Sequence, residues 1–253
     1  MPRVRIATGC HPHNAKHYDD ALEAVLRERL ADPRTAAVGE IGLDSHYDFS
    51  PRDDQRSAFR RQLRVAKECG LPVILHVREA HDEALAIMRD EGFPEAGTLL
   101  HCFNLDWDVL EPWVEAGCYV AFGGPLTFKK GDDTREAAAR VPADRLLTET
   151  DAPYMTPEPL RGTVCGPEHV IFTAERLAEV RGCAPGEERA ALLRDRLRAV
   201  QRLGTRQHVV AGAFAELDVA AFVQGQTRAC VCVLHYGGGA LQDKEYTLFH
   251  LTE

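Results

Sequence analysis

The sequence lacks the features that mark membrane proteins, secreted proteins and repeat proteins. No apolar run approaches the about 18 residues that a membrane-spanning helix needs, and the start, MPRVRIATG, has no apolar signal-peptide core. The chain contains neither an internal repeat nor a low-complexity segment. These absences predict a cytoplasmic protein with no membrane association.

Cysteine pairs of the kind that bind zinc or carry redox chemistry are also missing. The chain has 8 cysteines, but none are spaced as Cys-x-x-Cys. Cys230 and Cys232 form a Cys-x-Cys pair, a spacing that a strand explains. We therefore expect reduced thiols with structural roles.

Positive charge is in short supply. The 30 Lys and Arg residues are outnumbered by 39 Asp and Glu residues, which gives a formal net charge of −9. Proteins that grip long nucleic acids usually present a basic surface, so stable duplex binding is not expected. An enzyme that holds a single phosphate through metal ions remains possible, because the ions supply the positive charge locally.

What the chain does contain is an alternation of short apolar strands with amphipathic helices. The expected strands are 4–9, 35–41, 72–77, 97–103, 118–124 and 145–150, and the expected helices between them are 17–31, 51–69, 79–91, 105–116 and 132–140. Such alternation predicts an α/β fold with about six parallel strands and right-handed crossover helices. The pattern alone fits either part of a barrel or an open doubly wound sheet.

The pattern changes near residue 204. Two more helices are expected at 167–181 and 185–203, and from about 205 onward apolar, strand-like runs follow one another without crossover helices. We therefore expect a main domain over 1–204 and an irregular extension over 205–253 whose role is unknown. An appended segment that covers open sheet edges, a frameshifted reading and a gene-model error would each explain the extension.

Polar residues stand at or near the carboxyl ends of four of the expected strands: Glu40, His76, His101 and Asp151. Ligands bind at this end of the strands in parallel α/β folds. Each residue alone has an ordinary structural explanation, such as a hydrogen-bonded core histidine or a helix cap. Burying all four is costly unless they satisfy one another or a cation. The set predicts a site for Zn²⁺, Mn²⁺, Fe²⁺ or Mg²⁺.

A histidine pair opens the chain in the segment GCHPH. On a strand, His11 and His13 would point to the same side and could enter one pocket. A polar turn after a short strand explains the pair equally well.

Five segments together carry a family resemblance: GCHPHNA, AVGEIGLD, QLRVAKECGLPVILHVREA, LLHCF and LLTETDAPYMTPEPLRG. In this order, from about residue 4 to about residue 190, they resemble the motifs of the TatD family of metal-dependent deoxyribonucleases. The resemblance implies a distorted TIM barrel related to the amidohydrolases, with a metal cluster at the carboxyl ends of its strands.

The resemblance also implies roles for individual residues. Glu40 would bridge two metal ions, His76 and His101 would ligate one of them, and Asp151 would be a ligand that also orients or deprotonates the attacking water. His13 and Arg78 would lie near the substrate phosphate. Two more residues would support these ligands from behind: Asp44 and Glu149.

The implied reaction is hydrolysis of phosphodiester bonds in the manner of a 3′–5′ exonuclease, on DNA ends or single-stranded DNA. Mg²⁺, Mn²⁺ or Zn²⁺ would lower the pKa of the attacking water and neutralise charge on the phosphoryl oxygens. Two alternatives stay open: an amidohydrolase-like enzyme with a substrate other than DNA, and a non-catalytic remnant that binds a partner or one metal.

One departure from the family bears on activity. Family members begin with a strand that carries a D-x-H-x-H motif, and this sequence contains no such motif. Roughly two strand–helix units of the barrel are therefore expected to be missing. His11 and His13 match a separate family segment and cannot replace the motif. We expect one bound metal ion or none, and weak or absent activity.

Overall fold

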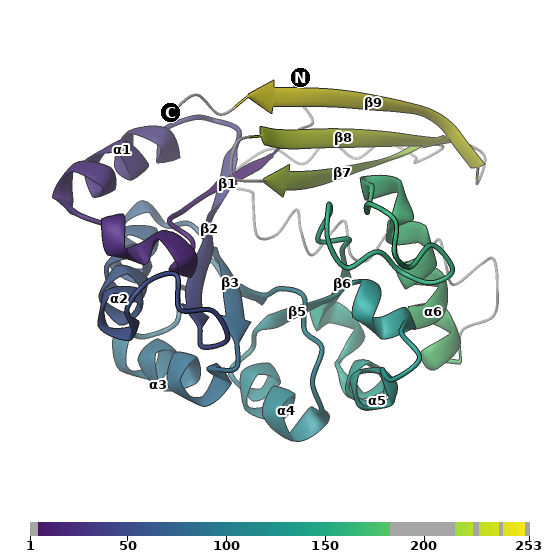
Figure 1. Cartoon of the computed structure of the whole chain (residues 1–253), viewed down its shortest axis with the longest axis horizontal. Coiled ribbons are helices and arrows are strands. Elements are labelled where there is room, and N and C mark those ends of the chain that lie inside the picture. The colour runs from purple at the N-terminus through teal and green to yellow at the C-terminus, as the bar shows by residue number, and fades with distance from the viewer. Residues whose placement is uncertain (1–4, 183–215, 225–227, 238–239, 251–253) are drawn as a thin grey trace.

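The computed structural model describes residues 5–182, 216–224, 228–237 and 240–250. Six parallel strands form one sheet in the order β1-β2-β3-β4-β5-β6 (Figure 1). Their bounds are Ile6–Thr8, Thr35–Asp44, Val73–Arg78, Thr98–Leu100, Tyr119–Phe122 and Leu146–Thr148. A doubly wound sheet reverses its strand order at a switch point. The strands here follow one another in sequential order, so the sheet is part of a barrel and not a doubly wound sheet. Its two edge strands are β1 and β6.

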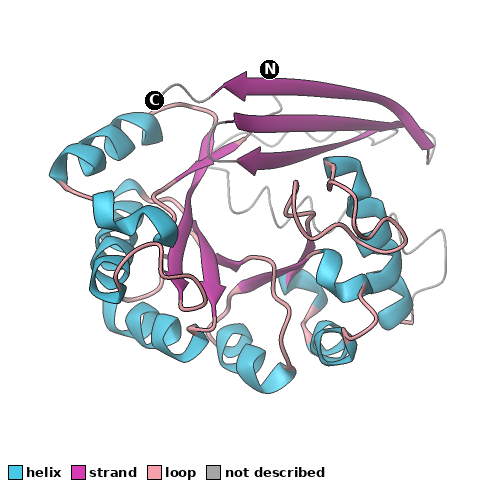
Figure 2. Cartoon of the chain, in the orientation of Figure 1, coloured by secondary structure: helices cyan, strands magenta, loops and turns pink. Residues whose placement is uncertain are grey.

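Helices follow the strands and cover the outside of the sheet (Figure 2). They are α1 Asp20–Leu30, α2 Arg52–Cys69, α3 His81–Glu91, α4 Trp107–Glu115, α5 Asp132–Arg140 and α6 Val170–Val180, with short 3-10 helices at Pro12–His17, Gly124–Thr127, Ala143–Arg145 and Pro167–His169. The predicted α/β architecture is confirmed. Among the described residues, no helix combines the length and the apolar character needed to cross a bilayer.

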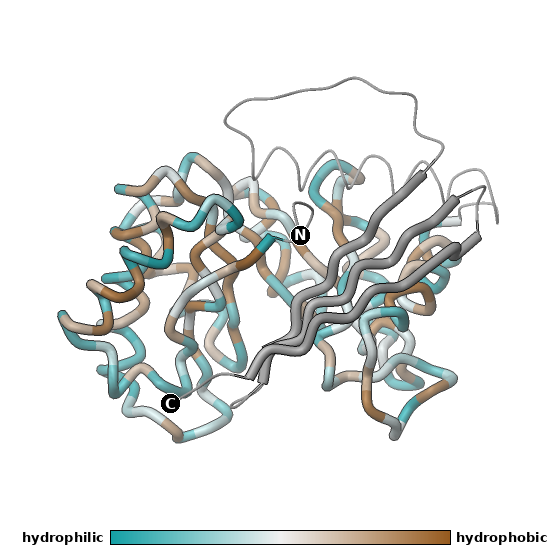
Figure 3. Tube along the Cα trace, turned by 90° about the horizontal axis from the view of Figure 1, so that it is seen from above, coloured by the Kyte–Doolittle hydropathy of each residue, from teal (hydrophilic) through white to brown (hydrophobic). Residues whose placement is uncertain are grey.

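Helix α2 illustrates why the sequence folds this way. Pro51 precedes its first turn, and Gly70 ends it in the left-handed conformation with φ of 64°. Phe59 and Leu63 lie one turn apart on its apolar face and are fully buried in the main core. Figure 3 shows that apolar and polar residues alternate in this way over residues 5–182, where brown apolar stretches are followed by teal polar ones.

Five of the six strands differ in length from the prediction, and the differences at β4 and β2 involve the predicted polar residues. Strand β4 ends at Leu100, so His101 follows the strand and Cys102 turns away with φ of 48°. Strand β2 continues to Asp44, so Glu40 lies inside the strand instead of near its end. The β2–β3 register shifts between Val38 and Ile41, and a bulge of this kind redirects a side chain.

The extension contains a second, antiparallel sheet of three strands: β7 Glu216–Gln224, β8 Arg228–Gly237 and β9 Ala240–His250. The expected strand-like runs without crossover helices thus form regular strands over these ranges. Cys230 and Cys232 lie in β8, as their spacing predicted. The expected helix at 185–203 and the expected boundary near 204 lie outside the described residues.

Candidate metal centre

Three of the four predicted polar residues converge at one end of the sheet. One ligand atom from each of Glu40, His76 and His101 lies within 4.8 Å of the others. His101 Nε2 is 3.6 Å from Glu40 Oε2 and 3.3 Å from His76 Nδ1. Strand β2 supplies the carboxylate, β3 supplies His76, and the turn after β4 supplies His101. Asp151 follows β6 and is not a member of this group, but its carboxyl interacts electrostatically with His101 and Glu40.

Asp44 fixes the orientation of His76. Its carboxylate is fully buried, and its Oδ2 is 3.1 Å from His76 Nε2. A carboxylate only accepts hydrogen bonds, so His76 donates through Nε2. Burial lowers the pKa of His76, which favours the neutral ring. Nδ1 therefore carries the lone pair, and this nitrogen faces His101, as a metal ligand requires.

Carboxylates surround His101 on two sides. Its Nδ1 lies 3.5 Å from Glu149 Oε1, and Glu149 also accepts a hydrogen bond from the backbone N–H of Cys102. Burial opposes the charged imidazolium, but Glu40 and Glu149 outweigh it and raise the pKa of His101 to about 10. The pocket around His101 is thus strongly negative, which favours a cation.

The negative charge of this pocket also affects Asp151. Burial is the main cause that raises its pKa to about 7; His101 opposes the increase, whereas Glu149 and Glu40 add to it. Its Oδ2 lies 3.8 Å from Cys102 Sγ. Carboxylate oxygens and imidazole nitrogens suit Zn²⁺ and Mn²⁺, and a divalent ion would relieve the repulsion among these carboxylates. The residues present therefore fit a divalent metal ion.

The two opening histidines have different surroundings. They flank Pro12 at the start of a 3-10 turn, so the strand period that would point them to one side does not apply. His11 Nε2 lies 3.8 Å from Glu40 Oε2, whereas His13 Nε2 is bonded to Asp44 Oδ2 at 2.7 Å. His11 thus faces the metal group, and sequence reasoning had selected His13. The expected contact of His13 with the phosphate stays a prediction.

A second possible metal group consists of His11, His13 and His76. It shares His76 with the first group, and a neutral imidazole offers one lone pair. The Nε2 atoms of His13 and His76 are both bonded to Asp44, and Nδ1 of His11 accepts the backbone N–H of His13 at 3.2 Å. The hydrogen bond to Nδ1 of His11 leaves the ring proton of the neutral imidazole on Nε2, so His11 has no lone pair free for a metal. The geometry therefore favours Glu40, His76 and His101 as the metal ligands.

Features of α2 and β2 that the sequence did not reveal hold these residues in place. Gln62 accepts the backbone N–H of Cys10 at 2.6 Å and donates to its carbonyl at 3.1 Å, which secures the turn with the two histidines. Gly42 has φ of 140°, and a Cβ there would lie 2.1 Å from the carbonyl oxygen of His76. Only glycine allows β2 and β3 to approach so closely.

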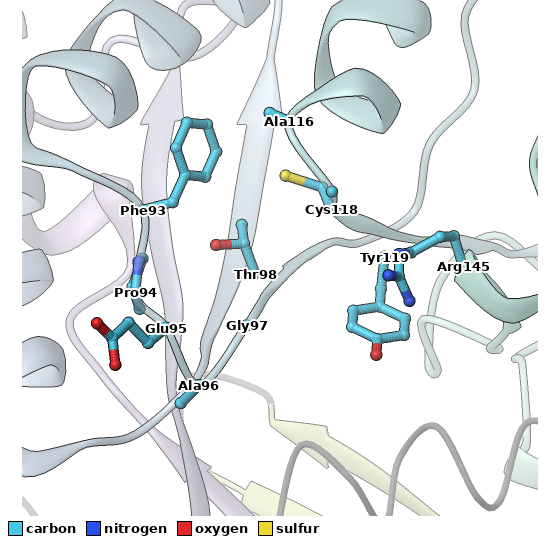
Figure 4. A pocket seen from close by; sticks show the side chains of 11 residues that line it. Phe93, Pro94, Glu95, Ala96, Gly97, Thr98, Ala116, Cys118, Tyr119 and Arg145 are labelled. Carbon is cyan, nitrogen blue, oxygen red and sulfur yellow. The ribbon is translucent and has the colours of Figure 1, made fainter.

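A separate cavity of about 350 Å³ opens at the other end of the strands (Figure 4). Thr98 and Tyr119 line it, and they are the first residues of β4 and β5, whereas His101 follows the end of β4. Residues at this end of a barrel serve stability more often than chemistry. The cavity therefore does not belong to the candidate metal centre.

Known proteins support the same interpretation. The sequence model of the family described as TatD related DNase matches residues 1–198. The chain is 39% identical to the uncharacterized metal-dependent hydrolase YabD of Bacillus subtilis over 70% of each chain. It is 34% identical to the 3′-5′ ssDNA/RNA exonuclease TatD of Shigella flexneri over 69% of each chain.

A solved structure agrees with these sequence matches. The crystal structure of YJJV, a TatD homologue from Escherichia coli, superposes with a TM-score of 0.74 at 29% identity, and the match covers 81% of this chain and 78% of that one. The chain described here belongs to the TatD family of related DNases.

Proposed function

We propose that this chain is a metal-dependent phosphodiesterase that removes nucleotides from the 3′ end of single-stranded DNA or RNA. The observation that carries the proposal is the convergence of Glu40, His76 and His101 in an acidic pocket. The relative from Shigella flexneri, named a 3′-5′ ssDNA/RNA exonuclease, supports this choice of substrate. The net charge of −9 agrees with a substrate held locally and not as a long duplex.

Each residue of the centre has a distinct proposed role. Glu40, His76 and His101 would hold the ion, which is Mg²⁺, Mn²⁺ or Zn²⁺. When bound, the ion would acidify an attacking water and neutralise charge that develops on the phosphoryl oxygens. Asp151, whose carboxyl lies within the electrostatic reach of Glu40 and Glu149, is proposed to orient that water and to accept its proton. Arg78 is proposed as a substrate contact.

We propose about one bound ion per chain, because the two possible groups share His76. The sequence predicts weak or absent activity because the D-x-H-x-H motif is missing, and we propose weak activity. The hydrolase domain is proposed to cover 1–204, and the family match, which ends at residue 198, supports this boundary. A cytoplasmic location is also proposed, since the described cysteines, Cys10, Cys69, Cys102, Cys118 and Cys165, are all free.

A single-strand degradation assay tests the proposal. An oligonucleotide labelled at its 5′ end should shorten progressively from its 3′ end in Mn²⁺, and it should stay intact when EDTA removes the ion. Asp151→Asn keeps the size of the side chain but removes the base, so we expect turnover to fall about 10²- to 10⁴-fold. Asp108→Asn, at an exposed position on α4, should leave turnover unchanged. Equal turnover by wild type and Asp151→Asn would contradict the proposed role.

A further inference from the structure

Two exposed aromatic rings lie in the loop between β2 and α2. Tyr47 is 39% exposed and Phe49 is 54% exposed. Their ring centroids are 5.1 Å apart with an angle of 14° between the planes, so the rings are stacked. Both belong to the exposed large hydrophobic side chains of the described residues, and they stack on each other. Two rings left in water do not contribute the free energy that their burial would supply. Apolar side chains exposed together in this way are a common sign of a binding surface.

A cation completes this surface. The guanidinium of Arg78, the last residue of β3, lies 4.8 Å from the centroid of the Tyr47 ring. The His46 ring meets Tyr47 edge-on at 4.6 Å and pairs with Glu79 at 2.7 Å. We call Tyr47, Phe49 and Arg78 the aromatic platform. Two flat rings and a planar cation match the flat faces of nucleobases.

The platform is held in a fixed position by Asp44, the residue that orients the metal ligand His76. Asp44 Oδ1 accepts the backbone N–H groups of His46 and Tyr47 at 2.9 and 3.0 Å. Arg52 donates to the carbonyl of Ser45 at 2.7 Å, which secures the start of the loop. A loop fixed before binding loses little entropy when a ligand arrives.

His13 lies between the platform and the metal centre. Its ring is edge-on to Phe49 at 4.9 Å and to Tyr47 at 5.5 Å, and it lies 5.9 Å from the ring of His76. A nucleotide whose phosphate lies at the metal ligands therefore has the platform within reach of its base. The two sites are neighbours and are oriented through the same buried carboxylate, Asp44.

We propose that the aromatic platform stacks a base of the single-stranded substrate beside the phosphate that is cleaved. This inference rests on the proposed function and adds to it the contact that recognises single strands. Stacking on aromatic rings is tolerant of sequence, and a base that is paired in a duplex must first be unpaired and unstacked at an energetic cost, which favours single strands. It also supplies affinity to a chain whose net charge of −9 gives little general attraction to phosphates.

The test compares an ordinary oligonucleotide with an abasic one, which has the same phosphates but no bases. Binding is measured by fluorescence anisotropy in Mn²⁺, with phosphorothioate linkages in both strands so that cleavage is slow. The wild type should bind the ordinary strand about 5- to 140-fold more tightly than the abasic strand, the range expected for stacking of one base. In the double variant Tyr47→Ala/Phe49→Ala this ratio should fall close to one. Tyr47→Phe, which keeps the ring, should retain the ratio.

Tyr119 provides a matched control. The Arg145 guanidinium lies 5.0 Å from its ring centroid, a contact like that of Arg78 on Tyr47, but at the far end of the strands (Figure 4). Tyr119→Ala should leave the binding ratio at its wild-type value. An unchanged binding ratio in Tyr47→Ala/Phe49→Ala, or a wild-type ratio near one, would overturn the proposal that the platform stacks a base. Cleavage of both strands with ordinary linkages in Mn²⁺ is scored separately, so loss of the proposed activity is distinguishable from loss of stacking.

Discussion

At the scale of single residues, Asp44 links the parts of the candidate site. Its buried carboxylate accepts hydrogen bonds from His13 and His76 on one oxygen, and from the loop amides of His46 and Tyr47 on the other. Burial favours the protonated acid, but these hydrogen bonds outweigh it and hold the pKa of Asp44 well below its usual value. Asp44 thus stays ionised and sets which nitrogen of His76 is free for a metal.

Replacing this carboxylate tests the orientation directly. In Asp44→Asn, an amide NH₂ facing His76 would require Nε2 to accept, so the ring proton would move to Nδ1, the nitrogen that faces His101. We expect Mn²⁺ affinity to fall about 10- to 100-fold, and the free energy of unfolding to fall by about 1–3 kcal/mol. Equilibrium dialysis and urea unfolding measure the two effects. Unchanged affinity in a folded Asp44→Asn variant would show that Asp44 does not orient the ligand.

At the scale of secondary-structure elements, much of the fold was predictable because buried parallel strands are apolar and helices show an apolar face. The position of Phe59 and Leu63 on α2, and the end of α2 at Gly70, follow from the sequence pattern. The orientation of His11 and the bulge at Glu40 do not, because they depend on a 3-10 turn and a register shift. Tyr47 and Phe49 lie in a loop, where no periodicity reveals which rings stack.

Contacts between α2 and α3 make stability depend on pH. Glu91, at the end of α3, accepts hydrogen bonds from Arg64 at 2.7 Å and Arg60 at 2.9 Å. The bond from Arg64 is the main cause that lowers the pKa of Glu91 to about 2; burial opposes it, and Arg60 assists. Since the unfolded chain has a value of about 4.3, the stabilisation is present above this pH and is lost as the pH falls to about 2.

Glu91→Gln removes this pH-dependent contribution. Both arginines are partly exposed to solvent, so we expect the variant to be about 1 kcal/mol less stable at pH 7. The difference from wild type should shrink as the pH falls from about 5 to about 2. Urea unfolding across this range measures it, with Glu28→Gln at an exposed position of α1 as a control. A difference that stays constant with pH would contradict the assignment to Glu91.

At the scale of the whole molecule, the sequential order of six parallel strands brings distant residues together. Glu40, His76 and His101 come from three neighbouring strand units, and Asp151 follows the sixth strand. The sequence predicted this meeting point, because ligands of parallel α/β folds gather at the carboxyl ends of strands. It did not show how carboxylates would be distributed around His101, since the approach of Glu149 depends on how the chain turns after β4 and β6.

The most direct test of the account is the number of Mn²⁺ ions bound after dialysis, measured by elemental analysis in wild type and two matched variants. His101→Asn removes Nε2, which faces Glu40 and His76. His11→Asn keeps an oxygen that can accept the N–H of His13 and so preserves the turn. The account predicts about one ion per chain in wild type and in His11→Asn, and none in His101→Asn. Retention of the ion by His101→Asn, or its loss from His11→Asn alone, would contradict the assignment of Glu40, His76 and His101 as the metal centre.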